Sequence, residues 1–291
     1  MSAAAMLVDL LGPDRIAIAD IGAADGLAKR WRPIAPALRV VAFEPDARAD
    51  AAADRALGAD VQVVNRAAAA RDGEASLYLT RKPRCSSLYP PNRAVIERYP
   101  DAERYDVVGT STVSCTTVDH ALASLGQSID FIKIDTQGAE LDVLRGAERS
   151  LDRCLGIEVE VEFQPLYEGA ALFRDVDGHV SARGFELYDL RRTFFARPTA
   201  VAAQRRGQLV FGDALYFRPW TALGSRRDAV VLAALLLAYG YADVAIELAG
   251  RSPLLSAADR LSLTRIANAL VPLAGDVERK DRFVGAGLHL G

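Results

Sequence analysis

The sequence of 291 residues is poor in the side chains that bind metals or form disulfide bonds. It has three cysteines, Cys85, Cys115 and Cys154, which are widely spaced and form no CxxC pair, and only three histidines. An odd number of cysteines at this spacing argues against both a disulfide framework and a zinc site. We therefore expect a protein of a reducing compartment with no bound metal.

The sequence also lacks segments that would direct it to or through a membrane. Its N-terminus has no positive charge before the first short apolar run, which Asp9 interrupts, so it does not resemble a signal peptide. The longest apolar run, Ala229 to Tyr239, is too short to span a bilayer. We expect a cytoplasmic protein without a membrane span.

Neither sign of charge is in large excess. The formal net charge is −3, and 51% of the residues are hydrophobic. A dedicated nucleic-acid binder usually carries a basic excess, so we expect no nucleic-acid partner. At roughly 100 to 200 residues per domain, the length allows one large domain with a smaller addition.

Short runs rich in β-branched residues recur along the first three quarters of the chain, separated by longer segments of helical composition such as 46–57. This alternation is typical of βαβ units and a parallel sheet. The last two runs could form an antiparallel edge. The predicted strands are 16–21, 39–43, 61–64, 75–80, 131–134, 157–161, 185–190 and 208–217.

The remaining segments divide the chain into two parts. Residues 81–111 contain four prolines with scattered Ser and Tyr, which is typical of a binding loop or lid. Its hydroxyls, Ser86 and Ser87 beside Tyr89, suit a polyol acceptor. After Pro219 three helices are predicted, and the first is apolar nearly all round, which indicates burial on more than one side. We expect a sheet domain over 1–220 and a helical C-terminal extension over 221–291, in a monomer or homodimer.

The strongest local motif is IADIGAADG, Ile18 to Gly26. Asp20 ends the first strand, and Gly22 and Gly26 follow in a strand-to-helix turn where the backbone can approach a ligand. The spacing is neither GxGxxG nor that of a P-loop. Asp25 would repel a pyrophosphate, whereas acidic groups suit the ammonium of an aminocarboxypropyl group. The turn therefore favours S-adenosylmethionine over NAD or ATP.

A second acid, Glu44, follows the second strand, about 20 residues beyond the glycine turn. In doubly wound folds a carboxylate at this place can accept hydrogen bonds from ribose hydroxyls. The pair formed by the glycine turn and Glu44 predicts a nucleoside-containing cofactor.

A third motif, Ile129 to Glu148, brings an acid to the carboxyl edge of the sheet. Strand alternation puts Lys133 and Asp135 on one face, and Gly138 permits a turn into a helix predicted over 139–151. A lysine on a central strand needs a carboxylate partner. Among three acids on one face of the next strand, we expect Glu160 to face the site and to pair with Lys133. Asp135 with Glu160 could alternatively hold a divalent cation.

Together these motifs resemble the FkbM family of S-adenosylmethionine-dependent methyltransferases, in order from about Ala19 to Leu190. The matching stretches are DIGAADG, FEPD, SSL, DFIKIDTQGAELDVLRGA, VEFQPLYEG, LFRDV and GFELYDL. The sequence departs from the family at Gln137, where Glu is frequent. The helices after Pro219 lie outside the resemblance.

The resemblance implies a class I methyltransferase fold, an α/β, Rossmann-like architecture with a mostly parallel seven-stranded sheet and one antiparallel strand. It implies O-methyl transfer to hydroxyls of sugars, polyketides or related metabolites. By family motif, Asp20, Gly22 and Gly26 would bind the methionine end of the cofactor and Glu44 its ribose. Ala67 would lie beside the adenine.

Methyl transfer is an in-line displacement, in which alignment and removal of the hydroxyl proton assist attack. The candidate catalytic residues are Asp135, Glu160 and Lys133, with Asp135 first, and the expected partner is a small-molecule or glycan hydroxyl. Two other functions compete with this hypothesis. One is a non-catalytic binding or scaffolding protein that retains the fold. The other is an NAD-dependent oxidoreductase, which the turn's spacing and Asp25 disfavour.

Overall fold

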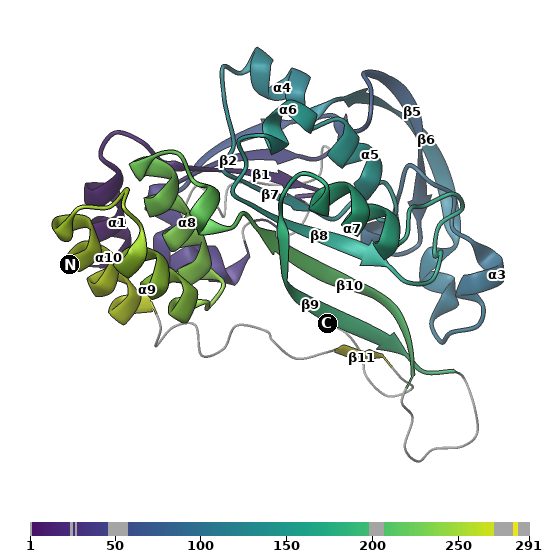
Figure 1. Ribbon diagram of the computed structural model, residues 1–291. Helices are drawn as coiled ribbons and strands as arrows, with labels where there is room; N and C mark the ends of the chain where they lie inside the picture. The colour runs from purple at the N-terminus through teal and green to yellow at the C-terminus, as the bar shows by residue number, and fades with distance from the viewer. Residues whose placement is uncertain are drawn as a thin grey trace.

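A twisted eight-stranded sheet forms the centre of the computed structural model, which describes residues 2–23, 26, 28–45, 58–197 and 207–270 and the backbone of 282–284. The strand order is β3-β2-β1-β7-β8-β10-β9-β11 (Figure 1). Five neighbouring strands, from β3 to β8, are parallel, and β10 runs antiparallel to both of its neighbours. The strands are β1 (Ile16–Ile21), β2 (Leu38–Phe43), β3 (Asp60–Val64), β7 (Phe131–Ile134), β8 (Gly156–Glu162), β9 (Glu186–Phe195), β10 (Gln208–Phe217) and β11 (Arg282–Val284).

Most of the predicted strands are confirmed, and the central ones are covered on both faces, as a parallel sheet requires. All six residues of β1 are buried. The strand predicted over 185–190 continues to Phe195, and β11 adds an eighth strand beside it. The helix expected over 46–57 lies outside the described residues.

Helices cover each face of the sheet. On one face lie α4 (Val118–Ser124), α5 (Glu140–Arg145), α6 (Glu148–Leu151) and α7 (Phe173–Ser181) (Figure 1). The single helix predicted over 139–151 is therefore two short helices. Gly146 lies between them, and a Cβ there would come within 2.2 Å of the Ala69 carbonyl oxygen. This close approach of the backbone requires glycine.

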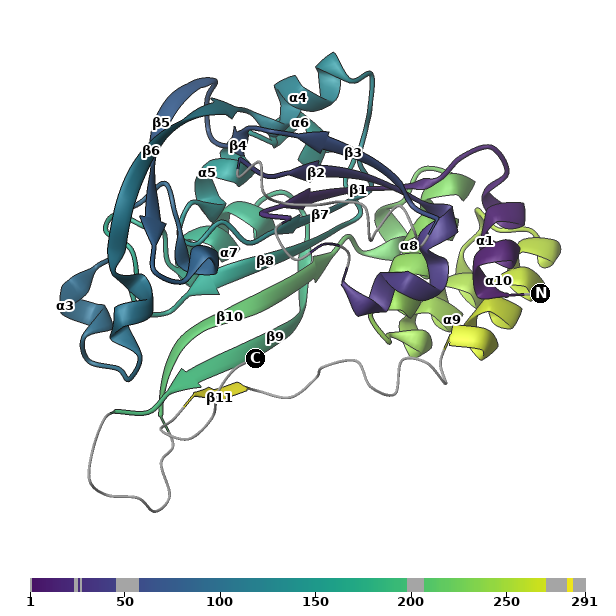
Figure 2. The ribbon, with the colours of Figure 1, turned by 180° about the vertical axis from the view of Figure 1, so that it is seen from behind.

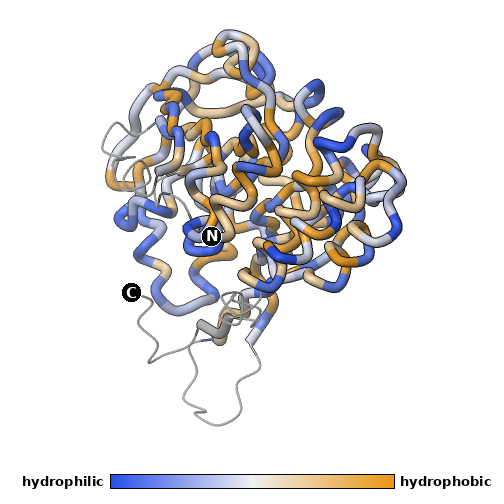
Figure 3. Tube along the Cα trace, turned by 90° about the vertical axis from the view of Figure 1, so that its left-hand side faces the viewer, coloured by the Kyte–Doolittle hydropathy of each residue, from blue (hydrophilic) through white to orange (hydrophobic). Residues whose placement is uncertain are grey.

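The other face is covered by α1 (Ala3–Leu11), by the 3₁₀ helix η1 (Lys29–Ala37) and by the C-terminal helices (Figure 2). These helices are α8 (Arg226–Ala238), α9 (Ala242–Arg251) and α10 (Ala257–Leu270). The ten residues from Ala229 to Ala238 are all buried, against Phe131 and Phe217 of the sheet and against the neighbouring helices. Figure 3 views the molecule from the side of these helices, where hydrophobic stretches alternate with hydrophilic ones.

A cap starts α8, and an ion pair holds it at the amino end of the sheet. The Ser225 hydroxyl accepts a hydrogen bond from the Asp228 amide at 3.1 Å and caps the helix. Arg227 pairs with Asp130 at 2.7 Å, and Asp130 also accepts from the Ala17 amide. The predicted burial of α8 on more than one side is met within this one chain.

A second, three-stranded sheet lies at the side of the first. It has the order β4-β6-β5 and consists of β4 (Ala67–Ala68), β5 (Gly73–Thr80) and β6 (Val107–Thr116). The sequence reasoning missed β6 and assigned its first residues to the Pro-rich loop. The loop itself contains η2 (Pro83–Cys85), α3 (Arg93–Ile96) and η3 (Ala102–Tyr105), and η4 (Trp220–Ala222) follows β10. Among the described residues, no helix is long and apolar enough to cross a membrane.

Candidate functional site

The first row of charged side chains crosses three strands near the carboxyl edge of the sheet. Register pairs Asp20 of β1 with Lys133 of β7, and Lys133 with Glu158 of β8. The Lys133 ammonium lies 3.4 Å from Asp20 Oδ1 and donates to the Gly22 carbonyl oxygen at 3.3 Å. It also lies 3.8 Å from Asp135 Oδ2. These contacts all gather around the start of the glycine turn.

The expected pairing of Lys133 with Glu160 is wrong. The register places Glu158, not Glu160, across from Lys133 on β8 and places Asp20 across from it on β1, so Lys133 ion-pairs with Asp20 and with Asp135, two residues further along its own chain. Burial disfavours the charged ammonium, but Asp20, Asp135 and Glu158 more than offset this and raise the pKa of Lys133. Burial raises the pKa of Asp20, and Lys133 opposes that shift. Lys133 thus remains charged, and its charge favours the ionised form of the buried Asp20 carboxyl.

A second row of charged side chains lies two residues further along the strands, closer to the carboxyl edge. It contains Asp135 after β7, Glu160 of β8 and Asp213 of β10, and Asp213 forms an ion pair with Arg191. The Gln137 amide nitrogen is 2.8 Å from both Asp135 Oδ1 and Glu160 Oε1. Burial, followed by repulsion from Asp135 and Asp213, raises the pKa of Glu160 well above its ordinary value. The row therefore contains an acid that is hard to ionise and suited to holding a proton.

The glycine turn is built against the end of β7. Gly22 has φ +79°, and a Cβ there would lie 2.0 Å from the Asp135 carbonyl oxygen. Its amide donates to the Phe43 carbonyl oxygen at 3.0 Å, which joins the turn to the end of β2. Gly26 has φ +66°, a conformation that also favours glycine. Asp25 lies outside the described residues.

The two other predicted cofactor residues lie beyond β2 and β3. Glu44 directly follows β2 and is buried, and its amide donates to the Val64 carbonyl oxygen at the end of β3. Ala67 is buried at the start of β4. Both therefore lie at the carboxyl edge, at the ends of consecutive strands.

The residues present fit S-adenosylmethionine. Asp20 Oδ1 is buried beside the Lys133 ammonium at 3.4 Å, but among the described residues no donor is directed at it well enough to form a hydrogen bond. An ammonium donor from a ligand would satisfy it. Gly22 lets the turn pack tightly against the end of β7, since a Cβ there would meet the Asp135 carbonyl oxygen, and the Asp135 carboxylate suits a sulfonium charge.

The two serines predicted to bind substrate are engaged within the protein. The Ser87 hydroxyl is buried, donates to the Gln137 carbonyl oxygen at 2.6 Å and accepts from the Tyr89 amide. The Ser86 hydroxyl accepts from the Thr80 amide at 3.1 Å. Ser87 thus ties the Pro-rich loop to the residue that bridges Asp135 and Glu160.

Sequence reasoning missed several groups around the second row. Gln137 was identified only as a departure from the family pattern, although its place two residues after Asp135 was a usable signal. Tyr167 donates to Gln137 Oε1 at 3.0 Å. Glu140 accepts from the Thr136 and Gly138 amides, and burial raises its pKa to about 6. The contact of Tyr167 with Gln137 joins residues 30 apart, so no local pattern indicated it, whereas Glu140 bonds to amides within its own turn.

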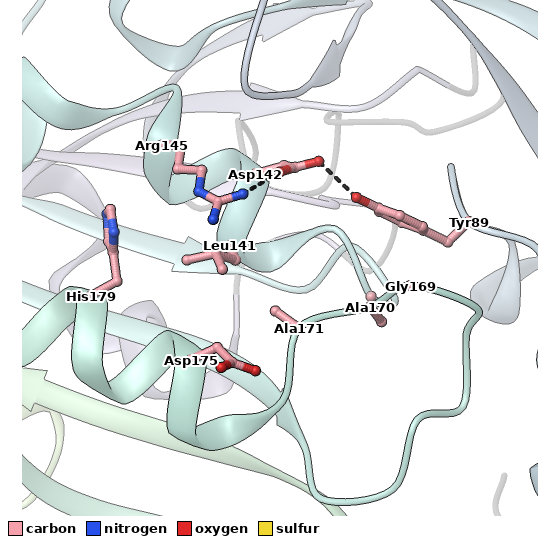
Figure 4. A pocket seen from close by; sticks show the side chains of 10 residues that line it. Tyr89, Leu141, Asp142, Arg145, Gly169, Ala170, Ala171, Asp175 and His179 are labelled. Atoms are coloured by element: carbon pink, nitrogen blue, oxygen red, sulfur yellow. Dashed lines mark hydrogen bonds and ion pairs between the residues drawn. The ribbon is translucent and has the colours of Figure 1, made fainter.

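A groove of about 470 Å³ opens beside this cluster, between α5, α7 and the Pro-rich loop (Figure 4). Gly138 and the small residues 169–171 line it together with hydrogen-bonding side chains. Tyr89 donates to Asp142 at 2.8 Å, and Arg145 lies 3.4 Å from the same carboxylate. The remaining lining residues are Leu141, Asp175 and His179. Across the described ranges, no group of three or more His, Cys, Asp or Glu side chains is placed to hold a metal ion.

The strand order, with one antiparallel strand inserted between the parallel strands β8 and β9, and the glycine turn after β1 are those of class I S-adenosylmethionine-dependent methyltransferases. The model of the methyltransferase FkbM domain matches residues 20–187. The chain belongs to this family and is an S-adenosylmethionine-dependent methyltransferase. The non-catalytic and NAD-dependent alternatives are therefore set aside.

The individual proteins that the chain resembles have low sequence identity to it. The chain is 28% identical over 177 residues to the 2-O-methyltransferase NoeI of Sinorhizobium fredii (strain NBRC 101917 / NGR234), covering 58% of this chain and 73% of the relative. Magnesium protoporphyrin IX methyltransferase from Synechocystis PCC 6803, solved with bound SAM, is 11% identical, with a TM-score of 0.37 and coverage of 74% and 76%. Precorrin-6y C5,15-methyltransferase from Geobacter metallireducens GS-15 is also 11% identical, with a TM-score of 0.33 and coverage of 74% and 88%.

Proposed function

We propose that this methyltransferase transfers its methyl group to a hydroxyl oxygen of a small-molecule or glycan acceptor, either a sugar or a secondary metabolite. The observation that carries the proposal is the acidic row Asp135–Glu160–Asp213 beside the glycine turn. A hydroxyl needs a hydrogen-bond acceptor that also takes its proton, and carboxylates supply both.

The chain's residues divide between the two reactants. When bound, S-adenosylmethionine supplies the methyl group on an electrophilic sulfonium. Asp20, Gly22 and Gly26 would hold its methionine end, Glu44 its ribose and Ala67 its adenine. Lys133 keeps a positive charge beside Asp20 and Asp135 and so limits the repulsion between these carboxylates.

The acceptor hydroxyl would donate to Asp135, the first candidate for the base, with Glu160 beside it. During attack its proton moves to a carboxylate oxygen of this pair. Gln137 holds the two carboxyl groups at fixed positions, so the acceptor meets an organised site. Burial and the neighbouring carboxylates raise the pKa of Glu160, so this side chain favours its protonated form beside Asp135.

Two features support a polyol acceptor. The relative NoeI is named as a 2-O-methyltransferase. The groove beside Gly138 combines small residues, an aromatic ring and hydrogen-bonding side chains of both charges, which suits a hydroxyl-rich chain that continues beyond the reacting unit. Ser86 and Ser87 belong to the acceptor side in this proposal, where Ser87 holds the Pro-rich loop against the cluster. A role in polysaccharide biosynthesis would follow.

The test uses the purified protein with methyl-labelled S-adenosylmethionine and paired acceptors. Each pair consists of a mono- or oligosaccharide and its analogue with the candidate hydroxyl already methylated. Label is expected on an oxygen of the free sugar and not on the blocked one, located by NMR. Transfer to nitrogen or carbon acceptors alone would overturn the proposal.

A further inference from the structure

The C-terminal helices reach the charged rows of the sheet through one side chain, Tyr239, directly after α8. Its hydroxyl donates to Glu158 Oε2 at 2.7 Å. Its ring is buried, and its centroid lies 5.5 Å from those of Trp31 and Phe131. The family match ends at residue 187, so this contact comes from a part of the chain that the family does not account for.

Glu158 has a second partner in Arg30, near the start of η1. One guanidinium nitrogen of Arg30 donates to both carboxylate oxygens, at 2.8 and 2.9 Å. The same guanidinium lies 4.6 Å from the centre of the Tyr239 ring. Because η1 begins shortly after Gly26, Arg30 fixes the far end of the glycine turn to β8. The near end is fixed by the Gly22 amide on Phe43.

Glu158 also borders the first charged row through its cross-strand neighbour Lys133. Arg30 faces it from η1 and Tyr239 from the end of α8, while Asp20, Arg191 and Asp213 act from β1, β9 and β10. Burial opposes ionisation of Glu158, but Arg30 and Tyr239 more than offset it and lower its pKa. Glu158 is therefore a carboxylate that both partners can hold.

We propose that Tyr239 is a positioning residue of the cofactor site, which holds the glycine turn in its binding geometry through Glu158 and Arg30. The inference rests on the proposed cofactor role of Asp20, Gly22 and Gly26. Without the hydroxyl, Glu158 loses one of its two anchors, and Arg30 loses a fixed partner. Through Tyr239, the C-terminal extension then helps to position the residues that bind the cofactor.

The first test is Tyr239→Phe, which removes the hydroxyl and keeps the ring packed against Trp31. S-adenosylhomocysteine binding is measured by calorimetry between pH 5 and 9. We expect affinity to fall about tenfold at neutral pH, since the lost hydrogen bond is to a charged group. Without the donated bond the pKa of Glu158 rises. As the pH is lowered, the variant should therefore begin to lose affinity at a higher pH than the wild type.

Tyr216→Phe is the matched control. Its hydroxyl is likewise bonded to a carboxylate, Asp177 at 3.0 Å, but on the opposite face of the sheet. This variant should bind S-adenosylhomocysteine as the wild type does. Wild-type affinity and pH dependence in Tyr239→Phe, with only a lower melting temperature, would show a purely structural tyrosine and overturn the inference.

Glu158→Gln completes the test. In that background Tyr239→Phe should cost little further affinity, because Tyr239 acts through the lost carboxylate; additive losses would contradict the proposal. If Tyr239→Phe does not fold, S-adenosylhomocysteine binding is measured in Glu158→Gln and Arg30→Lys instead. Wild-type affinity in both variants would overturn the proposal. Asp20→Asn distinguishes failure of the Tyr239 role from failure of the proposed cofactor site. If Asp20→Asn binds S-adenosylhomocysteine normally, the cofactor placement itself is wrong.

Discussion

The side-chain amide nitrogen of Gln137 lies 2.8 Å from Asp135 Oδ1 and 2.8 Å from Glu160 Oε1. An amide has two N–H donors, and here each carboxyl group receives one. The oxygen of the same side chain accepts from Tyr167. Gln137 has φ +58°, which turns its side chain back over the end of β7. One neutral residue thus bridges two acids that repel each other.

Gln137→Glu should impair this arrangement. A third carboxyl group would replace the donors, so the pKa of Glu160, already raised, should rise further. The acid limb of the kcat–pH profile should move to higher pH, and kcat at pH 7 should fall about tenfold. Gln127→Glu, whose side chain accepts from Arg39 far from the site, is the control. An unshifted profile would remove Gln137 from the catalytic cluster.

Asp135→Asn should leave the fold intact and lower turnover strongly. The substitution keeps the volume but removes a carboxylate from the carboxyl edge of the sheet. Loss of a general base typically costs about 100- to 10,000-fold in rate. The measurement is kcat with the identified acceptor, alongside the circular dichroism spectrum. Full activity would show that Asp135 is not the base.

Glu44→Ala should weaken S-adenosylhomocysteine binding more than any acid substitution outside the first two loops. The ribose hydroxyls would lose a charged acceptor, at roughly 1.5 to 3 kcal/mol. Calorimetry measures the change, with Glu186→Ala, an exposed acid at the amino end of β9, as control. Unchanged affinity in Glu44→Ala would refute the ribose assignment.

Glu162 should make stability depend on pH. It is buried, one of its oxygens has no hydrogen-bond partner in the described part of the chain, and burial followed by the Glu140 charge raises its pKa from 4.5 to about 9. The folded protein then keeps a proton that the unfolded chain releases, so stability falls as pH rises from about 4.5 to about 9. Melting temperatures of Glu162→Gln should fall less across this range than those of the wild type.

Asp259 provides the opposite case for the same experiment. Its hydrogen bond from Arg226 lowers its pKa to about 2. Its ionised form therefore adds stability above its ordinary pKa, which is lost as pH falls through about 2. Asp259→Asn should be destabilised at neutral pH and approach the wild type in strong acid. The same pH dependence in both variants would contradict these assignments.

Ending the chain near Thr221 should cause aggregation. This tests the proposed division into 1–220 and 221–291. Removal of α8 uncovers the apolar residues of the sheet that it contacts, including Phe131 and Phe217. Size-exclusion chromatography and thermal melting report the outcome. A truncated protein that stays monomeric and as heat-stable as the full chain would show that the helices form a separate module.

Local patterns in the sequence determined much of this architecture. The period-two alternation around Lys133 and Asp135 fixed which face of the sheet they occupy, because successive side chains of a strand point to opposite sides. Gly22 was predicted to let the backbone approach a ligand; the structure shows that glycine is also required for packing within the protein, because a Cβ there would lie 2.0 Å from the Asp135 carbonyl oxygen. The apolar surface of α8 likewise predicted its burial.

Tertiary structure alone decided which side chains meet. Alternation assigns a face but not a register, so Lys133 was paired with Glu160, whereas the strand alignment places Asp20 and Glu158 across from it. Long connections bring Ser87 to Gln137 and Tyr239 to Glu158, across separations at which sequence patterns carry no information. Partner choice depends on how the strands and helices pack, because each side chain pairs with whichever group that packing places beside it.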